Sequence, residues 1–125
     1  MSEGAVTADF PEVKRALRQR IIALRDTLVP KLRRAHGERI CAAILKLDAY
    51  REARLVAGYM SFGSELETRA LLEQVLADGK RLALPRIDSG RTRLELYEVE
   101  DLAADLQPGP WGIAEPDPQR CRKIA

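Results

Sequence analysis

The first part of the chain has the hydrophobic period of helices. Over residues 11–28, apolar side chains recur at steps of three and four and would form one stripe, made up of Val13, Leu17, Ile21, Leu24 and Leu28. A second helix is predicted over residues 30–47, with an interruption at His36 and Gly37. Residues 1–10 show no such period and are predicted to be a mobile leader. We expect both helices to pack on a sheet.

The middle of the chain alternates between strand and helix patterns. Residues 55–60 are apolar along most of their length, which is typical of a strand covered on both faces. Residues 68–78 return to a helical period, and a second strand is predicted over residues 81–84, ended by Pro85. Residues 93–99 alternate as a third strand. This order predicts a right-handed βαβ unit and an α/β fold with a mainly parallel sheet.

Composition narrows the class of protein. With 125 residues, 46% of them hydrophobic and 32% charged, the chain is long enough for one globular domain. It has no apolar run of membrane-spanning length and no secretory signal near its start, so we expect a cytoplasmic protein without a membrane partner. Cys41 is expected to be buried in the second helix, and Cys121 to be a free thiol near a frayed end. The single histidine, His36, has no partner in a recognisable motif and is assigned no catalytic role.

Positive charge is concentrated at the start of the chain. Residues 14–34 contain eight basic residues and one acid, a bias that favours either a polyanion or a ligand that carries phosphates. At about 100° per residue, Lys14, Arg18 and Arg25 fall along one edge of the apolar stripe of the first helix. Arg20, Arg33 and Arg34 are interpreted as part of a solvated helix face.

Chemistry is predicted where the first strand gives way to the following helix. Residues 61–67 form a short loop of small residues and acids at that point. Ligands of open α/β sheets bind outside the carboxyl ends of the strands, and Arg86, just after the second strand, lies on the same edge. We therefore expect the two loops to face one cleft.

Four segments carry a resemblance to a known family. They are Lys14-Arg15-Ala16-Leu17-Arg18, Ser61-Phe62-Gly63-Ser64-Glu65-Leu66-Glu67-Thr68, Leu84-Pro85-Arg86 and Trp111-Gly112-Ile113-Ala114-Glu115-Pro116. In this order and spacing they resemble the 5-formyltetrahydrofolate cyclo-ligase family, also called methenyltetrahydrofolate synthetase. The resemblance implies a three-layer α/β/α fold, similar to the ribose-5-phosphate isomerase and CoA-transferase type, in a protein that is monomeric when complete. It also implies an ATP- and Mg²⁺-dependent ligase that converts 5-formyltetrahydrofolate, with or without a polyglutamate tail, to 5,10-methenyltetrahydrofolate, releasing ADP and phosphate.

The resemblance also implies site residues. Lys14, Arg15 and Arg18 match the segment that contacts the phosphates of ATP, and Phe62, Glu67 and Trp111 match positions at the folate. These side chains suit a pterin ring, because a carboxylate in its plane can accept two hydrogen bonds and an aromatic face can stack on it. The structural alternatives are a helix N-terminal acid for Glu67 and packing roles for Phe62 and Trp111. Glu65 is interpreted as the solvent-facing acid of the loop. No metal ligand and no catalytic residue is assigned.

The chain departs from the family pattern in one respect. Family members continue with a glycine-rich basic loop of the Arg-Leu-Gly-x-Gly-x-Gly-Tyr-Tyr-Asp kind, and the sequence contains none. Residues 11–125 are therefore predicted to be the N-terminal portion of a cyclo-ligase domain, either a piece of a longer protein or a natural truncation, with no useful turnover alone. Two alternatives are a non-catalytic basic domain that binds nucleic acid through its first helix, and a structural fragment without activity.

Overall fold

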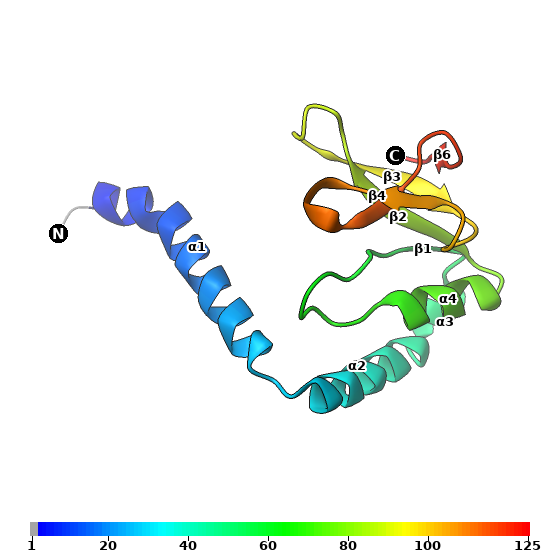
Figure 1. Ribbon diagram of the computed structural model, residues 1–125, viewed down its shortest axis with the longest axis horizontal. Coiled ribbons are helices and arrows are strands. Elements are labelled where there is room, and N and C mark those ends of the chain that lie inside the picture. Colours follow the sequence, from blue (N-terminus) through cyan, green and yellow to red (C-terminus); the bar gives the residue numbers. More distant parts are fainter. Residues whose placement is uncertain (1–2) are drawn as a thin grey trace.

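The computed structural model describes residues 3–125 as an α/β arrangement (Figure 1). The helices are α1 (Glu3–Asp26), α2 (Pro30–Leu45), α3 (Asp48–Glu52), α4 (Arg69–Ala77) and the 3-10 helix η1 (Pro110–Gly112). The strands are β1 (Leu55–Ala57), β2 (Arg81–Ile87), β3 (Leu94–Val99), β4 (Leu106–Pro108), β5 (Ala114–Pro116) and β6 (Arg122–Lys123). Elements that the sequence predicted therefore occur close to their expected places, and the α/β class is confirmed.

The main sheet is mixed, which corrects the expectation of a mainly parallel sheet. Its strand order is β1-β2-β3-β6, in which β1 and β2 run parallel and the other neighbours run antiparallel. The reason is the short connection between β2 and β3. Asp88 Oδ1 accepts a hydrogen bond from the Thr92 backbone N–H at 2.7 Å, and Arg91 has a φ of 54°. Such a turn joins antiparallel strands, whereas a parallel pair needs a long crossover.

Pro85 lies inside β2 and does not end it, contrary to the sequence prediction. The last bond of the parallel ladder runs from the Gly58 N–H to the Ala83 carbonyl at 2.9 Å. The next bond would need an N–H at position 85, which proline lacks, so the pairing with β1 stops there. On its other side β2 continues to pair with β3, where Pro85 lies opposite Leu96. Proline thus limits the length of β1 and opens the site at its carboxyl end.

The hydrophobic core lies on one face of the sheet. Leu72 and Val75 of α4 pack there on Leu82 and Leu84 of β2, all with 2% exposure or less. Gly58 makes this contact possible, because a Cβ at that position would lie 2.7 Å from Leu72 Cδ2. Further members of the same cluster are Tyr50, Tyr97, Val99, Leu102 and Cys121. The core therefore fixes α4 under β1 and β2, and with α4 the loop that precedes it.

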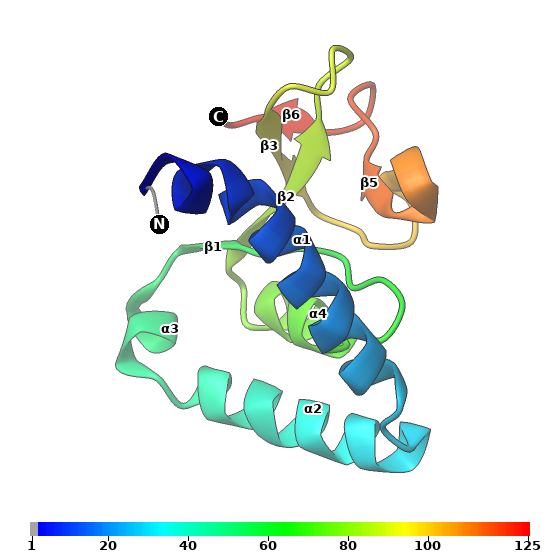
Figure 2. The same cartoon turned by 90° about the vertical axis from the view of Figure 1, so that its left-hand side faces the viewer.

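Helix α2 is continuous through His36 and Gly37, so the expected interruption is absent. Gly37 is buried, and a Cβ there would lie 3.3 Å from Leu66 Cδ1. The glycine thus permits close approach of the loop that follows β1. Figures 1 and 2 show α2 running beside α4.

The two thiols also differ from expectation, since Cys41 is only partly buried and Cys121 is buried in the core.

Helix α1 does not pack on the sheet, which corrects the expectation for it. Its apolar stripe stays exposed to solvent. The exposed fractions are 56% for Leu17, 51% for Ile21 and 57% for Leu24. Figure 1 shows the helix standing away from the rest of the molecule. An amphipathic pattern predicts that a helix has an apolar side but not which surface covers it. Part of the leader predicted over residues 1–10 lies outside the described residues, and from Glu3 onward the backbone is helical.

Candidate functional site

The loop between β1 and α4 is closed by Thr68. The buried Thr68 hydroxyl donates to the Tyr59 carbonyl at 2.6 Å and accepts from the Ser61 N–H at 3.0 Å. In return, the Thr68 N–H donates to the Ser61 hydroxyl at 3.2 Å. These reciprocal bonds satisfy backbone groups at the strand end and the helix start, which would otherwise lack partners. The loop between them is therefore held in a defined shape, as a binding site requires.

Phe62 is oriented by Glu65. The Glu65 carboxylate accepts a hydrogen bond from the Phe62 N–H at 2.7 Å, while the Glu65 N–H donates to the Phe62 carbonyl at 3.2 Å. Gly63 between them has a φ of 61°, which a glycine adopts without steric cost. Glu65 is half-buried and fixes the turn, so its interpretation as a solvent-facing acid is incomplete. The Phe62 ring is left 50% exposed at the tip of the loop.

Trp111 comes to Phe62 from far along the chain. A Cβ added to the neighbouring Gly112 would lie 3.8 Å from Phe62 Cε2, so the two loops lie close together. Trp111 is 66% exposed, and the Arg91 guanidinium lies 5.6 Å from the centre of its ring. Arg91 comes from the turn between β2 and β3, and the sequence did not indicate this contact. Two exposed aromatic rings at the end of a sheet form a surface on which a planar ligand can stack.

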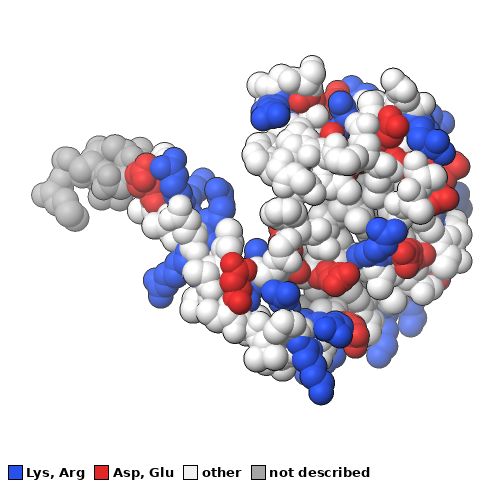
Figure 3. Space-filling model, in the orientation of Figure 1, with Lys and Arg blue, Asp and Glu red and all other residues white. Residues whose placement is uncertain are grey.

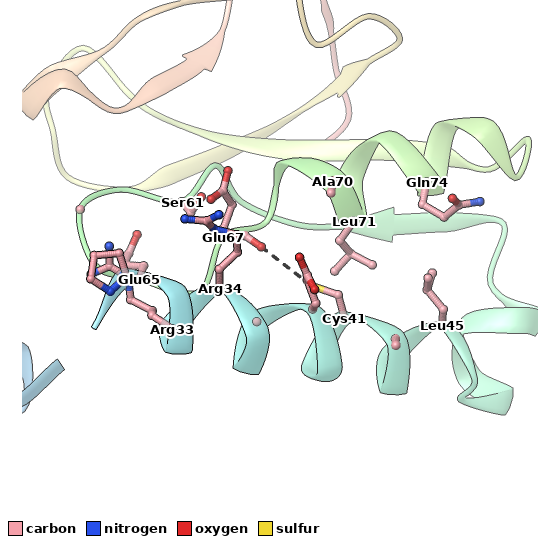
Figure 4. Close-up of a pocket in the computed structure, with 15 residues that line it drawn as sticks. Arg33, Arg34, Cys41, Leu45, Ser61, Glu65, Glu67, Ala70, Leu71 and Gln74 are labelled. Atoms are coloured by element: carbon pink, nitrogen blue, oxygen red, sulfur yellow. Dashed lines mark hydrogen bonds between the residues drawn. The ribbon is translucent and has the colours of Figure 1, made fainter. Parts of the chain in front are cut away.

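Glu67 lies on another side of the same loop. It is exposed and borders a groove of about 760 Å³ between α2 and α4 (Figure 4). Its carbonyl accepts a weak bond from Cys41 Sγ at 3.8 Å, and burial raises the pKa of that thiol. Arg33 and Arg34 of α2 line the same groove, with Leu45 and Leu71 among its apolar members. The structure thus joins Phe62 to Trp111, while Glu67 faces the neighbouring groove.

The basic residues of α1 are linked to the site through Arg25. Arg25 Nε donates to the buried Ser64 hydroxyl at 2.8 Å, which holds the end of α1 against the loop. By helical spacing, Lys14 and Arg18 project from the same side of α1 as Arg25. Arg18 is about 10 Å and Lys14 about 16 Å farther along the axis, at 1.5 Å per residue. They therefore face the open space that Figure 3 shows between α1 and the rest of the molecule.

Arg15 occupies a different side of the helix. It pairs with Glu12 at 3.3 Å in an exposed position, where such pairs contribute little to stability. Lys14 and Arg18 have no ion pair among the described residues. The role of the three basic residues at the phosphates of ATP stays a prediction from the sequence.

Arg86 lies near the loop that carries Trp111, residues 109–113 between β4 and β5, which we call the tryptophan loop. It is part of β2, and its Nε is 3.7 Å from Glu115 Oε1 of β5. Its Nη1 is 3.9 Å from Glu95 Oε1 of β3, the residue directly opposite. The sequence placed Arg86 at this edge of the sheet but did not reveal either carboxylate as its partner.

Metal-binding side chains are not gathered in the part of the chain that the structure describes. Among the side chains of residues 10–125, no three of the histidine, cysteine, aspartate and glutamate residues come close enough together to hold an ion. None of the helices within residues 3–125 has the length and hydrophobicity needed to cross a membrane.

Comparison with known proteins agrees with the resemblance. The sequence model of the 5-formyltetrahydrofolate cyclo-ligase family matches residues 11–125. The chain is 26% identical over 110 residues to a probable 5-formyltetrahydrofolate cyclo-ligase of Caenorhabditis elegans, covering 86% of this chain and 53% of the relative. It is 31% identical over 86 residues to a probable enzyme of the same name from Schizosaccharomyces pombe, covering 68% and 41%.

A solved structure extends the similarity to the fold. The chain superposes on the NMR structure of Aquifex aeolicus 5,10-methenyltetrahydrofolate synthetase with a TM-score of 0.77 and 27% identity. The match covers 90% of this chain and 55% of that one, so the chain spans about half the length of the relatives it matches. With a family match over nearly its whole length, this chain belongs to the 5-formyltetrahydrofolate cyclo-ligase family.

Proposed function

We propose that this chain supplies the folate-binding surface of an ATP-dependent ligase that converts 5-formyltetrahydrofolate to 5,10-methenyltetrahydrofolate. In this reaction the formyl oxygen on N5 attacks the γ-phosphorus of ATP, and ADP leaves. N10 then attacks the activated formyl carbon and loses its proton, and the carbon–oxygen bond breaks to release phosphate. The protein's part in such chemistry is mainly to position the reactants and to neutralise phosphate charge.

The observation that carries this proposal is the meeting of Phe62 and Trp111. The two residues come from separate loops, yet a Cβ added to Gly112, the neighbour of Trp111, would be within van der Waals distance of the Phe62 ring. Both rings are at least half exposed, although an aromatic side chain is stabilised by burial. A pterin ring that stacked on them would cover this apolar surface. Glu67, on the adjoining side of the same loop, is the acid proposed to accept hydrogen bonds from the pterin.

The nucleotide is proposed to lie along α1. Lys14 and Arg18 lie on the side of α1 that Arg25 holds toward the loop at Ser64. A triphosphate in the open space between α1 and Phe62 would meet these cations on one wall and the folate on the other. Arg15 is proposed as a weaker contributor, because it first has to leave Glu12. In this arrangement the γ-phosphate faces the formyl group across the space.

Mg²⁺ is proposed as the partner of ATP, whose phosphate charge it would neutralise. No cluster of three histidine, cysteine, aspartate or glutamate side chains that could hold the ion occurs among the described side chains, those of residues 10–125. The step that this chain performs is therefore the placement of folate and of the phosphates. Cytoplasmic location and a monomeric state when complete stay predictions from the sequence.

Folate binding by this chain is the direct test. We expect equilibrium dialysis with labelled 5-formyltetrahydrofolate to show saturable binding, and Phe62→Ala to weaken it by about tenfold, the loss of a stacking contact of about 1.4 kcal/mol. Phe10→Ala is the matched control, because Phe10 is 54% exposed on α1 and Phe62 50% exposed in the loop. Absence of binding, or equal effects of the two variants, would contradict the proposed function.

A further inference from the structure

The loop that presents Trp111 has a demanding backbone conformation. Trp111 has a φ of 60° and a ψ of 18°, and the following Gly112 has a φ of 78°. Left-handed backbone is uncommon for a residue with a large side chain and persists only when its surroundings determine it. Local bonds contribute, since the Gly109 N–H donates to the Ile113 carbonyl at 2.9 Å. These bonds close the loop but do not fix where it lies on the sheet.

A buried carboxylate supports the loop from below. Glu115 is only 9% exposed, and its side chain lies close to Gly109. A Cβ at Gly109 would lie 2.7 Å from Glu115 Cδ and 2.6 Å from the Ile113 carbonyl oxygen. Only glycine fits at this position without moving the glutamate. The acid therefore sets the height of the loop above the sheet.

Arg86 is the cation that holds this carboxylate. It follows Leu82 and Leu84 on the same face of β2 and so extends the core face toward the site. Its Nε, 3.7 Å from Glu115 Oε1, is buried and has no hydrogen-bond partner within the part of the chain whose side chains are described, residues 10–125. The second carboxylate, Glu95, is already bound to Lys123 Nζ at 2.7 Å. The four side chains Arg86, Lys123, Glu95 and Glu115 carry two positive and two negative charges. Their net charge is therefore zero, which argues against a binding site for a free anion.

We propose that Arg86 and Glu115 are positioning residues that set Trp111 relative to Phe62. The inference rests on the proposed function, because Trp111 is the folate contact through which they act. Glu115, paired with Arg86, lies against Gly109 on one side of the loop, and Phe62 and Arg91 lie near Gly112 and Trp111 on the other. Movement of the loop toward the sheet would shorten the 3.7 Å contact to a direct hydrogen bond.

The single tryptophan gives a readout that needs no ligand. In a proton–nitrogen correlation spectrum of the full chain, the Trp111 indole gives one signal. We expect Glu115→Gln and Arg86→Met each to shift or split it. Arg81→Met is the matched control, since Arg81 also lies on β2 and pairs with a glutamate of β3, Glu98, at 2.8 Å. It should leave the indole signal in place although it too removes an ion pair.

Folate affinity gives the second readout. Glu115→Gln should weaken binding of 5-formyltetrahydrofolate by about tenfold, and should have almost no further effect once Trp111→Ala is present, because both changes remove the same contact. An unchanged indole signal in folded Glu115→Gln would overturn the inference, as would additive effects of the two substitutions. Failure of the unaltered chain to bind folate would count against the proposed function, while the indole spectra would still decide the positioning role. If Arg86→Met does not fold, Glu115→Gln, which keeps the size of the side chain, decides alone.

Discussion

At the scale of single residues, a marked electrostatic effect lies away from the site, at Glu98. Arg81 donates two hydrogen bonds to this carboxylate, at 2.8 and 3.1 Å, and Arg122 donates a third at 2.9 Å. The Arg81 bonds are the main cause that lowers the pKa of Glu98 from 4.5 to about 2. Because the folded pKa is the lower one, the stabilisation is present in full above pH 4.5 and is lost as the pH falls toward 2.

We therefore predict that Glu98→Gln lowers the free energy of unfolding at neutral pH, and that its difference from the unaltered chain shrinks between pH 4.5 and 2. Urea unfolding at a series of pH values measures this difference. Glu100→Gln, at an exposed position next to the same strand, is the control. A difference for Glu98→Gln that does not change with pH would show that the ion pairs do not act through its charge.

The residue scale also shows what sequence could predict about the site. Phe62 and Trp111 were identified through the family resemblance, and the structure places the loops that carry them close together; their role at the folate stays a prediction. The sequence did not predict that Glu65 would bind the Phe62 N–H or that Glu115 would pair with Arg86. The partner of a carboxylate depends on the tertiary fold. Arg86 was placed at the correct edge by the strand pattern, but its position under the tryptophan loop required β5 to pack on β2.

At the scale of elements, periodicity predicted helices and strands better than it predicted their partners. The stripe of α1 and the apolar run of β1 were evident from the sequence, and both elements form. β3 runs antiparallel to β2 because the turn at Asp88 is short. The alternation of apolar and polar residues predicts a strand but not its direction. The exposed stripe of α1 shows the same limit, since amphipathicity specifies an apolar side without its partner.

The orientation of α1 leads to a prediction about its charges. Lys14 lies on the side of the helix that faces the loop, whereas Arg20 lies about 120° away around the axis. We expect Lys14→Ala to weaken ATP affinity by about tenfold or more, as loss of a hydrogen bond to a charged group costs about 1.5–3 kcal/mol. Arg20→Ala should change it less than about twofold. Equal losses in an ATP titration would indicate diffuse attraction and favour the nucleic-acid alternative.

The tether at Arg25 provides an independent test of the same geometry. Arg25→Met keeps the length of the side chain but removes the bond to Ser64. We predict that it weakens ATP affinity as Lys14→Ala does, although Arg25 itself is not proposed to touch the nucleotide. Its effect should disappear when Lys14 is already alanine, because both changes then act on the same contact. Additive losses would show that Arg25 binds ATP directly.

At the scale of the whole molecule, the proposed function assigns this chain one half of a reaction site. Figures 1 and 3 show an open space between α1 and the rest of the molecule. The relatives are about twice as long as the part that this chain matches. Phosphoryl transfer depends on holding the reactants in line, and the loss of such positioning can remove about 7–11 kcal/mol of catalysis. We expect this chain alone to bind folate but to have no useful turnover.

The central claim is that the two aromatic residues Phe62 and Trp111 carry the substrate of a folate ligase. It is tested most directly by the absorbance of methenyltetrahydrofolate formed from 5-formyltetrahydrofolate, ATP and Mg²⁺. The assay compares this chain with the same chain extended to the length of its relatives, with and without Phe62→Ala. We predict turnover by the extended chain, a fall of about tenfold in kcat/KM with Phe62→Ala, and none from the 125 residues alone. The claim would be contradicted if the extended chain showed no turnover, or if Phe62→Ala left its kcat/KM unchanged.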